Sequence, residues 1–230
     1  MKKSLFTMAL LLILIQPTVY SQAKPFRFGL RVAPTVDWLS PSSEGYENDG
    51  AAFGFNWGFM SDITLTDNYY FSTGFGIQHF NGKLQFEYQE VLDGNTEPTS
   101  GMLSRKYILR YVEVPLLIKM KTNKFDNIQY FGQIGFGLGL NVKATAKDTF
   151  TYSGGSSTGE SDISDEIVFL RGSWALGGGL EYYLDESTSL LVGLTFSNGI
   201  SNILKDNNPV TGIEQKAVPN YFELTLGIFF

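Results

Sequence analysis

Eight segments of the chain alternate large apolar residues with small or polar ones, and this two-residue period constrains the fold more than any other feature. Successive side chains of a β-strand point to opposite faces, so each segment predicts a strand with one apolar face and one small, polar face. The segments are residues 26–33, 53–65, 69–78, 111–120, 129–140, 170–182, 189–197 and 218–230. No segment has a convincing helical pattern.

The first 21 residues have the pattern of a secretory signal peptide. A basic start, Met1-Lys2-Lys3, precedes an apolar run over residues 5–15, and Ser21 is a small residue near the expected cut. We predict that residues 1–21 are removed and that residues 22–230 form one domain. Cleavage leaves 15 basic residues against 23 acidic ones, a net charge of −8. This acidic balance argues against a nucleic-acid partner.

The connections between the segments alternate between short and long. Residues 67–68, 122–127 and 185–187 are tight turns, whereas residues 40–50, 81–104, 143–166 and 198–216 are long and polar. Short periplasmic turns and long extracellular loops are typical of an outer-membrane barrel. The sequence therefore predicts an all-β, eight-stranded antiparallel transmembrane β-barrel in the cell outer membrane. Its surroundings would be outer-membrane lipid and lipopolysaccharide.

A soluble barrel is the competing all-β interpretation, and it would turn the apolar faces inward. Eight bulky apolar rows would overfill such an interior. The opposite faces carry mostly Gly, Ser, Thr, Gln and Asn, which suits a narrow lumen better than a water-facing surface. Aromatic residues near both strand ends, Tyr107 among them, are expected to form interfacial girdles. We therefore expect the apolar faces to meet lipid.

The small, polar faces also carry eight charged residues, four basic and four acidic. These are Arg27, Arg31, Asp62, Glu113, Lys119, Arg171, Glu181 and Glu223. An unpaired buried charge is costly, so we expect a structural network of ion pairs that fills the lumen. A proton or solute path is the alternative. Pro115 lies within a predicted strand, where its missing N–H predicts a bulge or a local opening.

The sequence offers little for catalysis, because it has no Cys and a single His, His79. Nucleophilic catalysis would need an Asp and a Ser held beside that His, and no motif joins them. We therefore expect a protein that is not an enzyme, with no catalytic, cofactor-binding or metal-ligating residues. The long segments are acidic through Glu44, Glu47, Asp49, Glu87, Glu90, Asp93, Glu97, Glu160, Asp162, Asp165 and Glu166. Their ordinary solvation is favoured over divalent-cation binding.

The stretch RYVEVPLLIKMK, residues 110–121, is followed by the glycine-rich stretch YFGQIGFGLGLNVKA, residues 130–144. This pair resembles the PorT-type outer-membrane β-barrel family of the Bacteroidota. The matching positions are Tyr111, Glu113, Pro115, Leu116, Leu117 and Lys119. The resemblance implies the barrel fold and, through one named family member, a link to type IX secretion and gliding. The family has no accepted catalytic residues, so none are carried over.

These observations lead to three hypotheses about function. The leading one is a non-catalytic accessory or structural subunit of an envelope complex, with the type IX secretion translocon as the candidate partner. The second is a surface adhesion or ligand-binding barrel that uses the long acidic loops. The third is a loop-based enzyme that depends on His79.

Overall fold

The computed structural model describes residues 26–91, 96–205, 207–208 and 210–230, so the predicted signal peptide lies outside the described residues. The strands are β1 (Phe26–Pro41), β2 (Tyr46–Asn48), β3 (Ala52–Thr66), β4 (Tyr69–Glu90), β5 (Thr99–Lys121), β6 (Ile128–Tyr152), β7 (Gly155–Asp162), β8 (Leu170–Tyr183), β9 (Ser189–Gly199) and β10 (Ala217–Phe229). A short 3₁₀ turn, η1, covers Ser164–Glu166. Within these ranges, no helix is long and apolar enough to cross a membrane.

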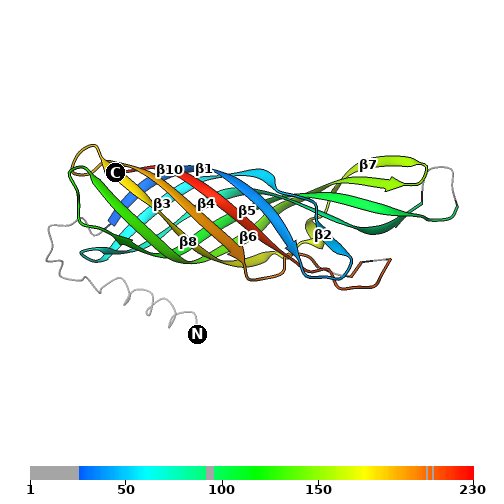
Figure 1. The fold of residues 1–230 in the computed structure, drawn as a ribbon. Coiled ribbons are helices and arrows are strands. Elements are labelled where there is room, and N and C mark those ends of the chain that lie inside the picture. The colour runs from blue at the N-terminus through cyan, green and yellow to red at the C-terminus, as the bar shows by residue number, and fades with distance from the viewer. Residues whose placement is uncertain (1–25, 92–95, 206, 209) are drawn as a thin grey trace, which may run out of the picture.

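Eight of the strands close into an antiparallel ring in the order β1, β3, β4, β5, β6, β8, β9 and β10 (Figure 1). The ring closes where β1 pairs with β10, with Gly29 opposite Phe229. Closure is what lipid demands, since hydrocarbon offers no hydrogen-bond partner to a free strand edge. The predicted eight-stranded barrel is confirmed.

Large apolar side chains cover the outside of the barrel. Exposed ones include Phe28, Leu30, Trp57, Phe75, Ile118, Ile134, Phe136, Leu176, Leu194, Leu224 and Leu226. The residues between them on each strand point into the lumen and are mostly buried. This is the arrangement of a membrane barrel, whereas a soluble barrel would have the opposite one.

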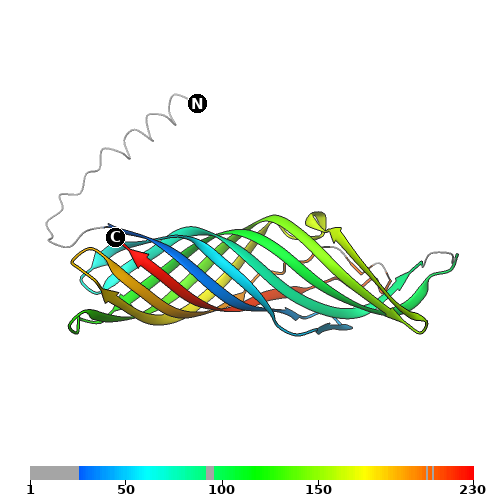
Figure 2. The same ribbon diagram turned by 90° about the horizontal axis from the view of Figure 1, so that it is seen from above.

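Three strands are much longer than a membrane crossing requires. β4, β5 and β6 have 22, 23 and 25 residues, whereas a tilted strand spans the bilayer with about 9–11. Their far halves leave the ring with β7 and β2 and form an extension beyond one end of the barrel (Figure 2). The expectation of long irregular loops at residues 81–104 and 143–166 is therefore wrong for most of these residues, which are paired strands.

The polarity of the two faces inverts along β4, and this inversion marks where the strand leaves the lipid. Up to Gln78 the inward residues are small or polar and the outward ones are apolar. Beyond His79 the inward residues are apolar, beginning with Phe80 and Leu84, and the outward ones are polar, such as Lys83. Strand β5 inverts at Arg110, which lies opposite His79. The extension thus has the pattern of a water-soluble sheet.

The inward apolar residues of the extension form an external core that closes one mouth of the barrel. Its members are Leu39, Tyr46, Phe80, Leu84, Phe86, Leu103, Tyr107, Leu109, Tyr111, Ala144, Ala146, Phe150, Ile163, Ile167, Ile203, Leu204, Ala217 and Tyr221. Tyr107 is 1% exposed within this core, so its predicted place in an interfacial girdle is wrong.

Two seams of the ring are interrupted, and each interruption contains a proline. Between β4 and β5 the register is the same on both sides, from Ser72 opposite Leu117 to Gly76 opposite Glu113, but residues 73–75 and 114–116 are not paired with each other. Pro115 would stand opposite Gly74, and it has no N–H to donate. A shorter gap separates residues 33–34 of β1, which include Pro34, from residues 224–225 of β10.

Candidate functional site

The lumen contains a lower cluster of charges near the end with the short turns. The Nζ atom of Lys119 lies 2.9 Å from Asp62, and the Nζ atom of Lys121 lies 2.8 Å from Glu181 and 3.2 Å from Asp62. Arg27 completes the cluster with an ion pair of 2.9 Å to Glu181. The cluster therefore holds three cations and two carboxylates, all enclosed by the barrel wall.

An upper cluster lies closer to the external core. Arg31 donates a hydrogen bond of 2.7 Å to Glu223, which also accepts from the Asn56 amide at 3.0 Å. Arg171 is 1% exposed, lies 3.7 Å from Glu113 and donates a hydrogen bond to Gln78. The lumen places all eight charged residues named from the sequence in these two clusters.

The residues of the PorT-like motif alternate between the two faces of β5. Tyr111, Glu113, Pro115, Leu117 and Lys119 face the lumen, while Leu116 faces outward and is 36% exposed. The Tyr111 ring lies 4.3 Å from the Arg171 guanidinium carbon. The lumen side of the motif therefore supplies partners for both charged clusters.

Glycines on the neighbouring strand make room for these large side chains. A Cβ atom at Gly139 would come within 2.7 Å of the Arg171 Nε atom, and one at Gly137 within 2.7 Å of the Ser173 hydroxyl. Both glycines face the lumen on β6, opposite β8. The glycine-rich stretch is thus explained by packing, because a longer side chain would displace the upper cluster.

Two buried charges were missed by the sequence reasoning. Lys121 lies between the expected strand, which ends at Met120, and the turn at residues 122–127, yet its side chain is 1% exposed between two carboxylates. Asp37 lies beyond the expected end of the first strand and accepts a hydrogen bond of 2.9 Å from the Asn81 N–H. A strict period of two continued past Pro34 and Met120 would have placed both in the lumen.

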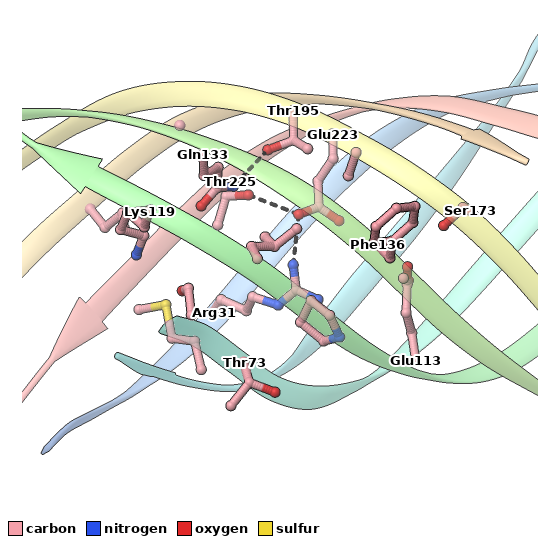
Figure 3. Close-up of a pocket in the computed structure, with 18 of the residues that line it drawn as sticks. Arg31, Thr73, Glu113, Lys119, Gln133, Phe136, Ser173, Thr195, Glu223 and Thr225 are labelled. Atoms are coloured by element: carbon pink, nitrogen blue, oxygen red, sulfur yellow. Dashed lines mark hydrogen bonds and ion pairs between the residues drawn. The ribbon is translucent and has the colours of Figure 1, made fainter. Parts of the chain in front are cut away.

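A cavity of about 70 Å³ lies between Lys119 of the lower cluster and Arg31 and Glu223 of the upper one, and Figure 3 shows the side chains that line it. Charged and polar side chains from several strands line it, including Arg31, Glu113, Lys119, Gln133, Thr195 and Glu223. Two hydrogen bonds join lining side chains: Gln133 on β6 donates to Thr195 on β9 (3.2 Å), and Thr225 donates to Glu223 on the same strand, β10 (2.8 Å). A cavity of this size and polarity has room for a few water molecules but not for a drug-sized ligand.

His79 lies on the outward face of β4, between Phe55 of β3 and Arg110 of β5. Among the described residues, its imidazole makes no hydrogen bond to another side chain. The structure therefore brings neither the carboxylate nor the hydroxyl that catalysis would require into contact with it.

The acidic residues of the long segments are dispersed. Asp49 accepts a hydrogen bond from Ser104, Glu90 accepts one from Ser157, and Glu160 pairs with Lys147 at 3.3 Å. Glu44, Glu47, Glu87, Glu97 and Asp165 are exposed, Asp162 accepts from the Ser164 N–H, and Asp93 lies outside the described residues. In the described ranges, no three His, Asp or Glu residues are grouped so that they could hold a metal ion.

The extension carries a set of hollows that share one aromatic residue, Tyr88. Three hollows of about 180, 330 and 250 Å³ each have Tyr88 in their lining. Their rims add Glu90 and Asp148 in the first, Glu87 and Ser100 in the second, and Arg105, Glu166 and Lys205 in the third. The Tyr88 ring packs edge-on against Phe86 and Phe150 of the external core. We call this set the Tyr88 hollows.

Arg105 fixes the geometry of one rim. Its guanidinium donates hydrogen bonds of 2.8 and 2.7 Å to both oxygens of Asp148 and one of 2.9 Å to Glu166. Burial opposes the positive charge, but these carboxylates more than offset burial and raise the pKa of Arg105 above its usual value. Burial disfavours the ionised form of the neighbouring Tyr107 hydroxyl and therefore raises its pKa. Arg105 is therefore charged at every physiological pH and holds β5, β6 and η1 together.

Comparisons with known proteins found a matching family model and similar solved structures. The family model for the outer membrane protein beta-barrel domain matches residues 16–205. Similar solved structures include Neisserial surface protein A (11% identity, TM-score 0.42, 91% of this chain and 98% of that chain) and OprG from Pseudomonas aeruginosa (14%, 0.43, 90% and 96%). The outer membrane protease OmpT from Escherichia coli is also similar (10%, 0.41, 89% and 94%).

No curated protein matches the chain. The family match covers most of the described barrel, and the closed ring with its apolar outer wall gives the same result independently. The chain belongs to the outer membrane protein beta-barrel domain family and is a protein of the outer membrane.

Proposed function

We propose that this protein is a surface ligand-binding barrel, in which the extension binds the ligand and the filled lumen serves as a rigid anchor. The observation that carries this proposal is the inversion of polarity at His79 and Arg110. Because of this inversion, the strands continue outside the lipid as a sheet with its own apolar core. A binding module needs such a core in order to fold in water. Binding sites concentrate on segments that a rigid scaffold holds in position.

The Tyr88 hollows are the best candidate for the binding site itself. An aromatic ring surrounded by carboxylate, hydroxyl and guanidinium groups suits a neutral, hydroxyl-rich ligand such as a glycan. Within the described residues, the Tyr88 hydroxyl has no hydrogen-bond partner, so it is available to a ligand. The same ring lines three adjacent hollows, which favours an extended ligand.

The test uses the purified barrel in lipid nanodiscs, applied to an array of immobilised glycans and extracellular-matrix proteins. Binding to one class of glycans, reduced at least tenfold by Tyr88→Ala, would support the proposal. Gln85→Ala is the matched control, because Gln85 lies on the opposite face of the same strand and should leave binding unchanged. Equal binding by wild type and Tyr88→Ala would refute the assignment of the hollows.

An accessory role in an envelope complex is the second candidate, and β7 favours it. Among the described strands, β7 pairs only with β6, which leaves one strand edge able to take a partner's strand. The type IX translocon as that partner is supported by the PorT-like motif alone. A gentle-detergent pull-down from the native outer membrane tests this role, and recovery of the barrel without stoichiometric partners would refute it.

The hypothesis of an enzyme dependent on His79 receives no geometric support from the contacts of that residue. His79→Ala is expected to leave glycan binding and barrel folding unchanged. Loss of an activity measured on the intact protein would overturn this expectation.

A further inference from the structure

The interruption between β4 and β5 lies beside the lumen cavity. Thr73 and Pro115, one from each unpaired segment, both belong to the cavity lining. On its outer side the same seam is bordered by Phe75 and Leu116, which are exposed to lipid. Along residues 73–75 and 114–116, the wall between the polar cavity and the hydrocarbon therefore lacks its β4–β5 ladder pairs.

We propose that this seam is a lateral portal, through which the polar end of a neutral single-chain amphiphile enters the lumen cavity from the membrane. A backbone N–H or C=O group without a hydrogen bond in hydrocarbon costs free energy. A seam that contains neither water nor a ligand is therefore less stable than one in which these groups have a partner. A hydroxyl group from a membrane-dissolved molecule can hydrogen-bond with them.

The wall on either side of the seam keeps its shape. Residues 73–75 of β4 remain paired with β3, and residues 114–116 of β5 remain paired with β6. Gly74 has a φ of 151°, and a Cβ atom there would come within 2.2 Å of the Phe59 carbonyl oxygen. The opening is thus a fixed feature of two strands that are otherwise fully supported.

The size of the cavity limits what can enter. About 70 Å³ holds a few heavy atoms, so a polar head fits whereas its chain must stay outside, along the lipid-facing wall. The external core closes the mouth above, and of the two gaps in the wall the one between β4 and β5 is the longer, with three unpaired residues on each strand against two between β1 and β10.

The charges of the lining favour a neutral head. Arg31 is paired with Glu223 and Lys119 with Asp62, so no lining cation is free to bind an anion. The Glu113 carboxylate accepts a hydrogen bond of 2.8 Å from Tyr221 through Oε1, while its Oε2 atom is buried, lies 3.7 Å from the Arg171 guanidinium and accepts no hydrogen bond from the described residues. A hydroxyl that donates to this oxygen would complete the site.

A photoactivatable octanol that carries a diazirine tests the portal. The barrel is reconstituted in phosphatidylcholine vesicles, illuminated with the probe and mapped by mass spectrometry. The expected result is label on the inward residue Leu117 or on Thr73, displaced by excess n-octanol. Pro115→Val restores the missing N–H donor and should reduce this label at least fivefold.

Two controls separate the portal from general effects. Pro34→Val changes the other proline gap, and it should leave the label on Leu117 and Thr73 unchanged. Thr73→Cys with Leu116→Cys introduces the only two thiols of the chain on facing segments, so oxidation should abolish the label and reduction should restore it. Heat-modifiable gel migration confirms that each variant is folded.

Label confined to outward residues such as Ile118 in the wild type would overturn the proposal. Equal labelling of the inward residues in the wild type, Pro115→Val and the oxidised double-Cys variant would overturn it as well, since the probe would then enter by another route.

Discussion

The loss of a carboxylate from the lower charge cluster should lower the stability of the barrel more than the loss of a cation does. It holds Arg27, Lys119 and Lys121 against Asp62 and Glu181. Asp62→Asn removes the negative charge that pairs with two lysines at 2.9 and 3.2 Å, and it leaves three cations facing one carboxylate. Breaking a buried pair in this way costs about 3–5 kcal/mol.

Lys121→Met removes a cation from a cluster that has one in excess. Asp62 keeps Lys119 at 2.9 Å and Glu181 keeps Arg27 at 2.9 Å, so neither carboxylate is left unpaired. We expect a loss below about 2 kcal/mol, within the ordinary range for single substitutions. The prediction is therefore an order: Asp62→Asn destabilises the barrel more than Lys121→Met does.

The assay is urea unfolding of the barrel in phospholipid vesicles, followed by the fluorescence of Trp38, Trp57 and Trp174. The double variant Asp62→Asn, Lys119→Met restores the wild-type net charge of the cluster, so it should be more stable than Asp62→Asn alone. An equal loss for both single variants, or a larger loss for Lys121→Met, would refute the charge-balance argument.

Three further predictions address other parts of the chain. Gly58→Ala should destabilise the barrel by about 1–3 kcal/mol in the same assay, because its Cβ would lie 2.3 Å from the Phe75 carbonyl oxygen, whereas Gly132→Ala meets nothing within 4 Å and should be tolerated; equal effects would contradict this. Arg105→Gln should make the extension cleavable by added protease while the barrel stays resistant, and an unchanged digestion pattern would contradict the role given to its three hydrogen bonds with Asp148 and Glu166. The backbone N–H groups of Ser187 and Thr188 lower the pKa of Asp185 to about 2, so this carboxylate stabilises the folded turn above about pH 4 and loses that effect as the pH falls towards 2. Asp185→Asn should therefore flatten the pH dependence of unfolding between pH 4 and 2, and an unchanged slope there would contradict the assignment.

The closed barrel and the direction of its faces could be predicted from the sequence. A strand in lipid must pair along both edges and must turn its apolar side chains towards the hydrocarbon. Phe53, Phe55, Trp57 and Phe59 share one parity, and only an apolar solvent accepts such a row outside a narrow barrel. The parity also identified which charged residues face the lumen. It could not identify their partners, since Arg31 and Glu223 meet at the β1–β10 seam that closes the ring, although they are 192 positions apart in the sequence.

The extension was missed for a physical reason. Phe80, Leu84, Phe86 and Tyr88 keep the period of two, but Lys83, Gln85 and Glu87 between them read as a polar loop when the strand is assumed to end with the membrane. The even-numbered residues point inward along the whole of β4. What changes beyond His79 is the solvent outside the strand, from lipid to water. The first strand was likewise ended too early, at Ala33, whereas β1 continues through Pro34 to Pro41.

The continuity of β4 and β5 has a mechanical consequence. Each of the two strands runs without a linker from the barrel into the extension (Figure 1), and their mutual pairing has a gap at residues 73–75 and 114–116. A force applied to the tip is therefore transmitted as tension along the strands and as shear between them. No flexible joint absorbs it. The first weak point that this load meets inside the membrane is the three-residue gap at Pro115. A tethered load on the outer surface would strain the wall at that level, which is 16 residues along each strand from the last pair of the β4–β5 ladder, Glu90 and Thr99 (90 − 74 and 115 − 99).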